Sequence, residues 1–280
     1  MIIWIASYPK SGNTWIRAML SAYFYSNDGK FVFDLLENIK EFPKHSEYLN
    51  KRSADKNLNE IAREWIPAQE DLNLKSTDSK FFLKTHSAIC SIDGSDFTNK
   101  KNTLAAIYIV RDPRNVISSL SNHFNINIEK SVELILDKNK IISNPTNENK
   151  NIGLTVLSNW KTHYQSWRDW KSVKVKIIKY EDLIHSPNET FINILNFLKE
   201  FMKVQVNENK ISNVIKSTEF KTLKLSEQKY GFKESGAMSN QNKNFFNLGP
   251  KNNWEELLNQ EVSEKICEYF ESEMKELGYI

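Results

Sequence analysis

A segment rich in anion-binding residue types follows the first apolar run of the chain, and it reads Tyr-Pro-Lys-Ser-Gly-Asn-Thr-Trp over residues 8–15. Between a strand and a helix, backbone N–H groups and the positive end of the helix converge on an anion. Gly12 would let a ligand approach the backbone, and Lys10 would add a mobile cation. Asn13 and Thr14 would cap the helix or donate to phosphate oxygens. The pattern predicts a phosphate-type site, with a ligand-free capped turn as the alternative.

This segment differs from the phosphate loop of nucleoside triphosphatases. That loop has a glycine, four residues and then Gly-Lys-Ser/Thr, whereas here the lysine precedes the only glycine of the segment. No carboxylate–hydroxyl pair stands beside the segment in a position to hold Mg²⁺. We therefore predict no metal at this site.

A second anion-binding pattern follows the apolar run 104–110. Residues 111–115 read Arg-Asp-Pro-Arg-Asn, and Ser119 lies eight positions after Arg111. Proline is tolerated at the first position of a helix, so Arg111 would end a strand and Ser119 would lie in the second helical turn. A guanidinium with a hydroxyl suits a terminal phosphate. A surface ion pair between Arg111 and Asp112 is the alternative.

A histidine with a neighbouring lysine follows the short apolar run 81–83. His86 is a candidate general base, because histidine titrates near neutrality. Lys84 and Lys10 are candidates for stabilising negative charge that develops during a reaction. The other histidines are interpreted as structural or surface residues: His45, His123, His163 and His185.

In these three segments the chain resembles the sulfotransferases that use 3′-phosphoadenosine 5′-phosphosulfate (PAPS). That family has a Tyr-Pro-Lys-Ser-Gly-(Thr/Asn)-Thr-Trp loop after its first strand and a Lys-Thr-His motif. It also has an Arg-Asp-Pro-Arg stretch with a serine eight positions after the first arginine. The opening Trp-Ile-Ala-Ser-Tyr-Pro-Lys-Ser-Gly-Asn-Thr-Trp of this chain is most similar to bacterial members, including those that sulfate glycopeptide antibiotics.

The resemblance implies a role for each matching residue. Trp15 would contact the adenine, and Arg111 with Ser119 would bind the 3′-phosphate. His86 would be the base, with Lys10 and Lys84 as charge stabilisers. Five residues of the first loop would contact the phosphosulfate: Lys10, Ser11, Gly12, Asn13 and Thr14.

Two weaker matches lie further along the chain. Tyr180, in Lys-Tyr-Glu-Asp-Leu, corresponds to a family tyrosine near the nucleotide, and a core tyrosine is the alternative. The stretch Ser-Thr-Glu-Phe at 217–220 resembles a family segment whose threonine and phenylalanine flank the adenine. The resemblance therefore implies that Thr218 and Phe220 contact the adenine.

The last family motif, Phe-(Phe/x)-Arg-Lys-Gly-x-x-Gly-x-Trp, is the least similar. Gly249 and Trp254 keep their spacing, so Gly249 would contact the 3′-phosphate. The positions of the arginine and lysine hold Asn247 and Leu248. The resemblance therefore implies weaker binding of the donor, or a substitute cation such as Lys251.

The elements that must position these residues follow from apolar runs and helical spacing. Strands are predicted at 2–6, 81–83, 104–110 and 173–178. Helices are predicted at 14–25, 58–69, 113–124, 152–170, 187–198, 206–215 and 254–277, and residues 224–250 are predicted to be a long loop. Strands that alternate with helices indicate a parallel sheet covered on both faces. We therefore predict one α/β domain over 1–280, with a central parallel sheet of four or five strands flanked by helices and a P-loop-like topology.

Composition sets further bounds. The 280 residues are 40% hydrophobic with a formal net charge of +3, which is too mild to indicate a nucleic-acid partner. The two cysteines, Cys90 and Cys267, have neither metal-ligand nor disulfide spacing. The opening apolar run is too short for a signal peptide or a membrane anchor. We predict a cytoplasmic protein without a membrane partner.

The predicted function is sulfuryl transfer from PAPS to a hydroxyl or amine of a small-molecule or glycoconjugate acceptor. The acceptor pocket would come from the segments 40–78, 123–151 and 224–247, whose polar composition favours a polar acceptor. One alternative is an ATP- and magnesium-dependent phosphotransferase. Another is a non-catalytic scaffold that binds adenosine bisphosphate.

Overall fold

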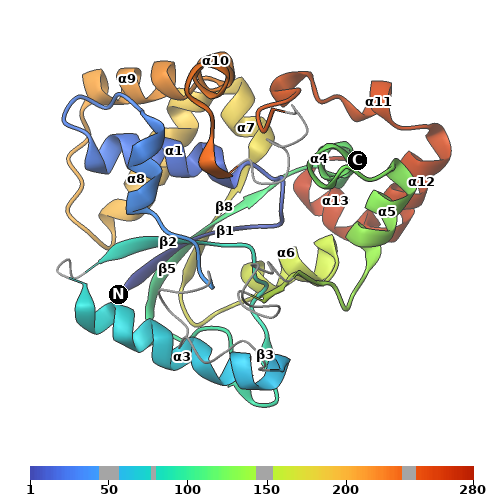
Figure 1. Ribbon diagram of the computed structural model, residues 1–280, viewed down its shortest axis with the longest axis horizontal. Coiled ribbons are helices and arrows are strands. Elements are labelled where there is room, and N and C mark those ends of the chain that lie inside the picture. Colours follow the sequence, from blue (N-terminus) through green and yellow to red (C-terminus); the bar gives the residue numbers. More distant parts are fainter. Residues whose placement is uncertain (44–56, 77–79, 143–153, 235–243) are drawn as a thin grey trace.

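Four parallel strands form the centre of the fold. The computed structural model describes residues 1–43, 57–76, 80–142, 154–234 and 244–280. The strands lie in the order β2-β1-β5-β8 (Figure 1), and their bounds are Phe81–Thr85, Ile2–Ser7, Thr103–Val110 and Lys174–Lys179. Each strand pairs in parallel with its neighbour. The prediction of a single α/β domain around a parallel sheet of four or five strands is confirmed.

Side chains of the central strands alternate between two apolar layers, as the strand period of two requires. Ile3 and Ile5 of β1 face the layer that contains α1 (Asn13–Tyr25), α8 (Pro187–Lys199) and α9 (Glu208–Thr218). Ile2 and Trp4 face the other layer. The helices of that layer include α3 (Leu58–Lys75), α6 (Trp160–Arg168), α12 (Gln260–Tyr269) and α13 (Glu271–Leu277), and buried residues of two further helices, Pro113–Phe124 and Ile128–Leu136, join it. Helices thus cover both faces of the sheet (Figure 1).

The remaining elements lie around the edges of this core. Two short antiparallel pairs are β3 (Ser91–Ile92) with β4 (Ser95–Asp96), and β6 (Ile141–Ile142) with β7 (Thr155–Val156). The other helices are η1 (Phe33–Asn38), α4 (Pro113–Phe124), α5 (Ile128–Leu136), α7 (Tyr180–His185), α10 (Phe220–Tyr230), η4 (Gly249–Lys251) and α11 (Trp254–Leu257). In the described ranges, no helix has both the length and the apolar character needed to cross a bilayer.

Asparagine side chains fix the start of several helices, because an amide oxygen at the cap accepts one of the unpaired N–H groups of the first turn. Asn57 accepts from Glu60 N–H in a capping box and begins α3. The same kind of cap precedes α5, α6, α9, α11 and α12, at Asn127, Asn159, Asn207, Asn253 and Asn259.

The predicted helix over 152–170 is wrong at its start. Residues 154–158 are not helical: they include β7, Ser158 has φ +57°, and α6 begins only after Asn159, which accepts from Thr162 N–H at 2.8 Å. Leu154 and Leu157 are buried in the structure, and a helix over these residues would have buried them too. Hydrophobic periodicity therefore could not distinguish a helix from a non-helical segment here. Residues 152–153 lie outside the described residues.

Two predictions in the C-terminal half also need correction. Part of the predicted loop over 224–250 belongs to α10, whose inner face is Leu223 and Glu227 and which ends at Gly231 with φ +73°. Residues 235–243 of that segment lie outside the described residues. The predicted helix over 254–277 is three helices, because Asn259 caps α12 and Phe270 separates α12 from α13.

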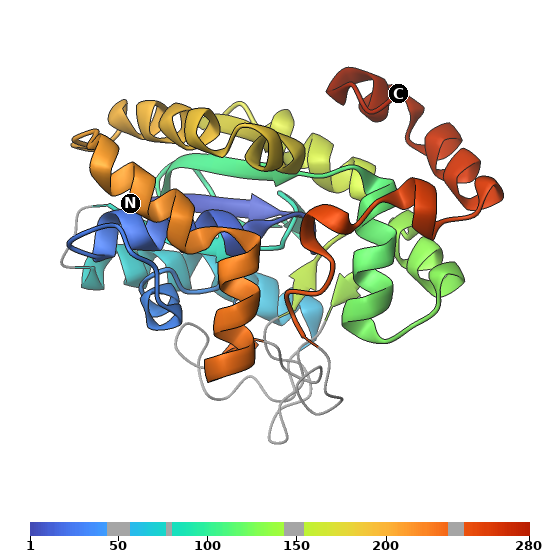
Figure 2. The same cartoon turned by 90° about the horizontal axis from the view of Figure 1, so that it is seen from above.

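The carboxyl ends of the strands place the predicted site residues at one edge of the sheet. The loop after β1 leads into α1, the turn after β5 leads into α4, and β8 leads directly into α7. Figure 2 shows that the segment that follows residue 244 lies near this edge, between α10 and α4. Ligands of open α/β sheets bind beyond such strand ends, which makes this edge the place for a site.

Candidate active site

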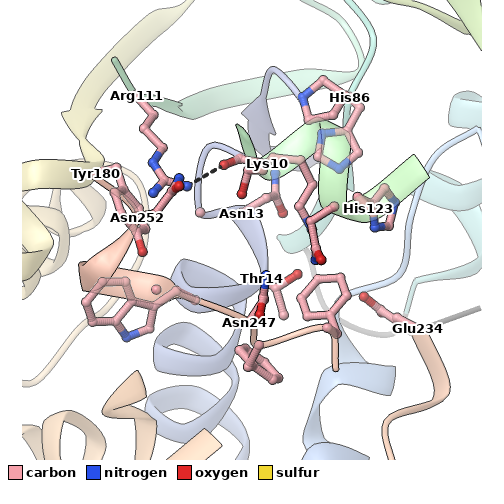
Figure 3. Close-up of a pocket in the computed structure, with 18 of the residues that line it drawn as sticks. Lys10, Asn13, Thr14, His86, Arg111, His123, Tyr180, Glu234, Asn247 and Asn252 are labelled. Atoms are coloured by element: carbon pink, nitrogen blue, oxygen red, sulfur yellow. Dashed lines mark hydrogen bonds between the residues drawn. The ribbon is translucent and has the colours of Figure 1, made fainter. Parts of the chain in front are cut away.

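A cavity of about 430 Å³ opens at this edge of the sheet. Its walls come from the loop after β1, the start of α1, the residues after β2, and α4, α7, α10 and the segment 245–252. In Figure 3, Arg111, Tyr180 and Asn252 lie at one end, and His86 and His123 lie at the other. Arg111, which sequence analysis assigned to the 3′-phosphate, and His86, which it assigned to proton transfer, thus face one pocket from opposite ends.

The turn after β1 leaves several backbone donors unused. Gly12, at φ +101°, precedes α1 without a side-chain cap. Within the described residues, the N–H groups of Gly12, Asn13 and Thr14 form no hydrogen bond, as expected at a helix start. A Cβ atom at Gly12 would lie 2.5 Å from a ring carbon of Tyr180. The turn therefore requires glycine both for its conformation and for its contact with α7.

Lys10 extends into the pocket beside this turn. Its backbone has φ +66°, and its Nζ lies 4.2 Å from the centre of the Phe245 ring. Burial, together with the positive charges of Arg111 and Lys84, lowers the pKa of Lys10 to about 7, while Glu227 opposes the shift. A lysine so placed gains a proton readily when an anion arrives.

Asn13, Thr14 and Ser11 have different surroundings in this turn. The amide nitrogen of Asn13 donates to the Ile5 carbonyl at 3.0 Å and to Ser7 Oγ at 3.2 Å, so its donors hold the turn to β1. Neither Asn13 nor Thr14 caps the helix, because Gly12 occupies the cap position, so of the two roles predicted for them donation to phosphate oxygens stays a prediction. Thr14 lines the pocket, whereas Ser11 is buried outside its lining.

Arg111 is a buried cation at the end of β5. One of its terminal nitrogens donates to the Lys10 carbonyl at 3.1 Å, and its guanidinium lies 4.1 Å from the centre of the Tyr180 ring. No carboxylate in the described part of the chain forms an ion pair with it, and its Nε has no hydrogen-bond partner there. A buried, unpaired guanidinium is costly unless a ligand supplies the negative charge.

The alternative pairing of Arg111 with Asp112 is wrong. Asp112 instead binds Arg114 at 2.7 Å, and both side chains are buried. Arg114 also stacks on Trp254, 3.8 Å from the ring centre, and donates to the Tyr279 carbonyl. Arg114, the second arginine of the motif, therefore connects α4 to the C-terminal segment through its contacts with Trp254 and Tyr279.

His86 has a fixed tautomer. Its Nδ1 lies 2.8 Å from the Ser7 carbonyl oxygen, which can only accept, so Nδ1 carries the proton. Nε2 then keeps its lone pair, as a general base requires. Burial lowers the pKa of His86 to about 3, and the charge of Lys84 adds to this effect. The imidazole therefore stays neutral across the physiological range of pH.

His163 supports His86 from behind the pocket. Its Nε2 donates to the His86 carbonyl at 3.0 Å, and its Nδ1 accepts from the Tyr108 hydroxyl at 2.8 Å. Burial lowers the pKa of His163 to about 4, so this ring is also neutral. The structural interpretation of His163 agrees with its position in the core, and its contact connects it to the candidate base.

Lys84 lies in β2 and is nearly buried. Its Nζ forms an ion pair with Glu41 at 3.2 Å, and both side chains line the pocket. Residues 40 and 42 also bond to the backbone of Lys84, which places Glu41 beside it. Lys84 is thus close enough to the candidate base to lower its pKa, with Glu41 opposing that effect.

Sequence analysis missed several residues that line the end of the pocket near His86. Glu234 faces the pocket and binds the buried Arg17 at 2.8 Å, and these two charges compensate each other. His123 contacts Phe245 edge-on, and burial lowers its pKa to about 3. Glu234 lies within the segment 224–247 and His123 lies at the start of the segment 123–151, both of which were predicted to contribute to the acceptor pocket. No sequence motif singled out either residue.

The remaining predicted contacts divide into two groups. Trp15, Ser119, Tyr180, Phe220 and Gly249 all line the pocket, and Trp15 meets Tyr180 edge-on at 5.7 Å. Thr218 does not line it: its side chain is fully buried, and its hydroxyl donates to the Val214 carbonyl at 2.8 Å.

A model of the family described as "Sulfotransferase domain" matches residues 2–278. The chain belongs to the sulfotransferase family. Rabbit (Oryctolagus cuniculus) amine sulfotransferase is 22% identical over 283 residues, which cover 98% of this chain and 81% of that protein. Firefly (Photinus pyralis) luciferin sulfotransferase is 24% identical over 230 residues, which cover 79% of this chain and 56% of that protein.

The crystal structure of mouse sulfotransferase SULT7A1 complexed with PAP has the same fold. It is 19% identical, with a TM-score of 0.60, and the match covers 97% of this chain and 83% of that chain. The predicted family and the predicted enzyme class are confirmed. The rabbit, firefly and mouse relatives are animal proteins, so the greater similarity to bacterial sulfotransferases stays a prediction.

Among the cations of the family pattern, two are replaced in this sulfotransferase. Asn247 lines the pocket, and Leu248 is 38% exposed beside it. Lys251 is exposed on η4 and lines an adjacent cavity rather than the pocket itself. Asn252, which stands where the family has its second glycine, is buried and lines both cavities.

Proposed function

We propose that this sulfotransferase moves a sulfuryl group from PAPS to a hydroxyl or amine, with His86 as the general base. The observation that carries the proposal is that one cavity contains both an unprotonated Nε2 on His86 and N–H groups without a hydrogen bond in the turn at Gly12. Both belong to one cavity of about 430 Å³. The first suits proton removal and the second suits an anion.

The residues of the pocket fit the donor better at its 5′ end than at its 3′ end. The turn provides the backbone N–H groups of Gly12, Asn13 and Thr14, and Lys10 lines the same pocket. Trp15 and Phe220 provide aromatic surface for the adenine. At the 3′ end, Arg111 is a buried cation without a carboxylate partner in the described ranges, and Ser119 lies nearby on α4.

The bound donor would supply the sulfuryl group and a phosphate leaving group, and the protein would position the reactants. His86 would take the proton of the acceptor at Nε2 while the Ser7 carbonyl holds its Nδ1–H. Lys10 and the N–H groups of the turn would stabilise charge on the leaving oxygen. Lys84, which already lines the pocket, would do so once its Nζ exchanges Glu41 for the donor.

The acceptor is proposed to be a small polar molecule. The rabbit and firefly relatives are named for an amine and for luciferin, both small molecules. The end of the pocket near His86 combines the carboxylates of Glu41 and Glu234 with the rings of His123 and Phe245. Carboxylates that accept hydrogen bonds, beside aromatic surface, suit an acceptor with polar substituents on an apolar frame. The glycoconjugate acceptor and the cytoplasmic location remain predictions.

A paired assay of transfer and binding tests the proposal. Labelled PAPS with a panel of hydroxylated and amine acceptors should give labelled product with the native chain. His86→Gln should lower the rate by about 10²-fold or more. Calorimetry with adenosine 3′,5′-bisphosphate should show nearly the same affinity for both chains. Preference for ATP with magnesium would favour the phosphotransferase, and binding without turnover on any acceptor would favour the scaffold.

A further inference from the structure

The end of the pocket around Arg111 is built mainly from neutral polar groups. Ser118 and Ser119 of α4 line the pocket, as do Asn247 and Asn252, and Figure 3 shows Asn252 beside Arg111 and Tyr180, with Asn247 nearer to Thr14. Asn252 is 7% exposed. Its Oδ1 accepts from Ser118 Oγ at 2.6 Å, and its Nδ2 donates to the Asn115 carbonyl at 2.7 Å. A side chain held in this way occupies space that a glycine at the same position would leave open.

Among the described cations that line the pocket, Arg111 lies at this end (Figure 3), and outside the lining Lys224 Nζ donates to the Asn247 carbonyl at 2.8 Å. Lys84 is close enough to His86 to lower its pKa and is paired with Glu41 at 3.2 Å, and Lys233 is paired with Glu37 at 3.6 Å. The Arg111 guanidinium already gives one N–H to the Lys10 carbonyl. A phosphate here would therefore meet one partly used guanidinium together with hydroxyl and amide groups, whereas the family pattern provides an additional arginine and lysine.

Neutral hydroxyl and amide groups match a ribose hydroxyl as well as they match a phosphate. A charge-assisted hydrogen bond changes affinity by about 10- to 100-fold, and a neutral one changes it by about 10-fold or less. With three cations, the 3′-phosphate would add a factor of about 10³ or more to affinity. With Arg111 as its one cationic contact among the described residues that line this end, the 3′-phosphate would add about 10- to 100-fold.

From these contacts, which extend the proposed function, we infer that this sulfotransferase distinguishes 3′-phosphorylated from unphosphorylated adenine nucleotides only weakly, and that it also accepts adenosine 5′-phosphosulfate as a donor. In that turnover the S–O bond to the 5′-phosphate breaks and a new S–O bond forms to the acceptor. The acceptor's proton passes to His86, and adenosine 5′-monophosphate leaves. Arg111 is the residue that sets the remaining preference.

Calorimetry with two nucleotides tests the inference without turnover. The full chain is titrated with adenosine 3′,5′-bisphosphate and with adenosine 5′-monophosphate, in buffer with a chelator. The bisphosphate should bind about 10- to 100-fold more tightly. A ratio above about 10³ would refute the inference and leave the proposed function intact. Failure to bind either nucleotide would refute the proposed function, and the inference with it.

Two substitutions test whether Arg111 is responsible for the preference for the 3′-phosphorylated nucleotide. Arg111→Gln should bring the affinity ratio close to one. Lys251→Ala removes the exposed lysine of the adjacent cavity and should leave the ratio unchanged. A fall of tenfold or more in Lys251→Ala would make Lys251 the substitute cation and overturn the inference.

A gain of function provides the complementary test. The triple variant Asn247→Arg, Leu248→Lys and Asn252→Gly restores the family pattern and should raise the ratio by about tenfold or more. In a transfer assay, the native chain should use adenosine 5′-phosphosulfate with a kcat/KM within about 100-fold of that for PAPS. No transfer from adenosine 5′-phosphosulfate under conditions where PAPS reacts would contradict the second part of the inference.

Discussion

Binding of adenosine 3′,5′-bisphosphate should be coupled to uptake of a proton by Lys10. In the free protein, burial and neighbouring cations lower the pKa of Lys10 to about 7 from its ordinary 10.5. An anion beside its Nζ favours the charged form and raises that pKa again. At pH 8 the free lysine is about one-tenth protonated and the bound one almost fully protonated, so about 0.9 proton is taken up. Affinity should then fall about 25-fold between pH 7.5 and 9.

Calorimetry in two buffers with different enthalpies of ionisation measures this uptake directly, as the slope of the observed enthalpy. Above pH 7.5 the phosphates are fully ionised, since their second pKa is about 6, so they contribute little. The low pKa values of His86 and His123, about 3 each, remove those rings from the same range. Lys10→Arg keeps the charge but cannot lose its proton, so its uptake should be near zero. An uptake below about 0.2 in the native chain at pH 8, or equal uptake in both chains, would refute the reasoning.

Three further predictions concern residues around the pocket. Gly12→Ala should lower the free energy of unfolding by about 1–3 kcal/mol, because φ +101° and a 2.5 Å contact with Tyr180 both oppose a side chain. The control Gly94→Ala has φ +75° but no atom within 4 Å, so chemical denaturation should show a smaller loss. His163→Phe removes the hydrogen bond to the His86 carbonyl, which should lower kcat by about tenfold and leave the affinity for the bisphosphate unchanged. An equal loss of affinity would indicate a general structural role. A chelator should leave the transfer rate unchanged, since Lys10 and backbone N–H groups provide the positive charge, and loss of activity restored by magnesium would contradict the mechanism.

The order of elements and the position of the turn proposed to bind an anion could be predicted from sequence. Apolar runs fix strands when flanking turns end them, as at Ile2–Ser7 and Thr103–Val110. A lysine and a glycine two positions apart before a helix are typical of a turn that binds an anion, so the turn at Gly12 could be predicted from its residue types. The segment 154–158 was predicted incorrectly, because Leu154 and Leu157 are buried at a spacing that both a helix and a non-helical segment permit.

Only the tertiary structure decided which side chains are free to act. Sequence places Asp112 next to Arg111, yet folding pairs Asp112 with Arg114 and leaves Arg111 without a carboxylate among the described residues. The tautomer of His86 depends on the Ser7 carbonyl, 79 positions away, and its support depends on His163, 77 positions away. Residue type sets what a group can do, but its protonation and its partners depend on burial and on contacts between distant segments, which local sequence does not contain.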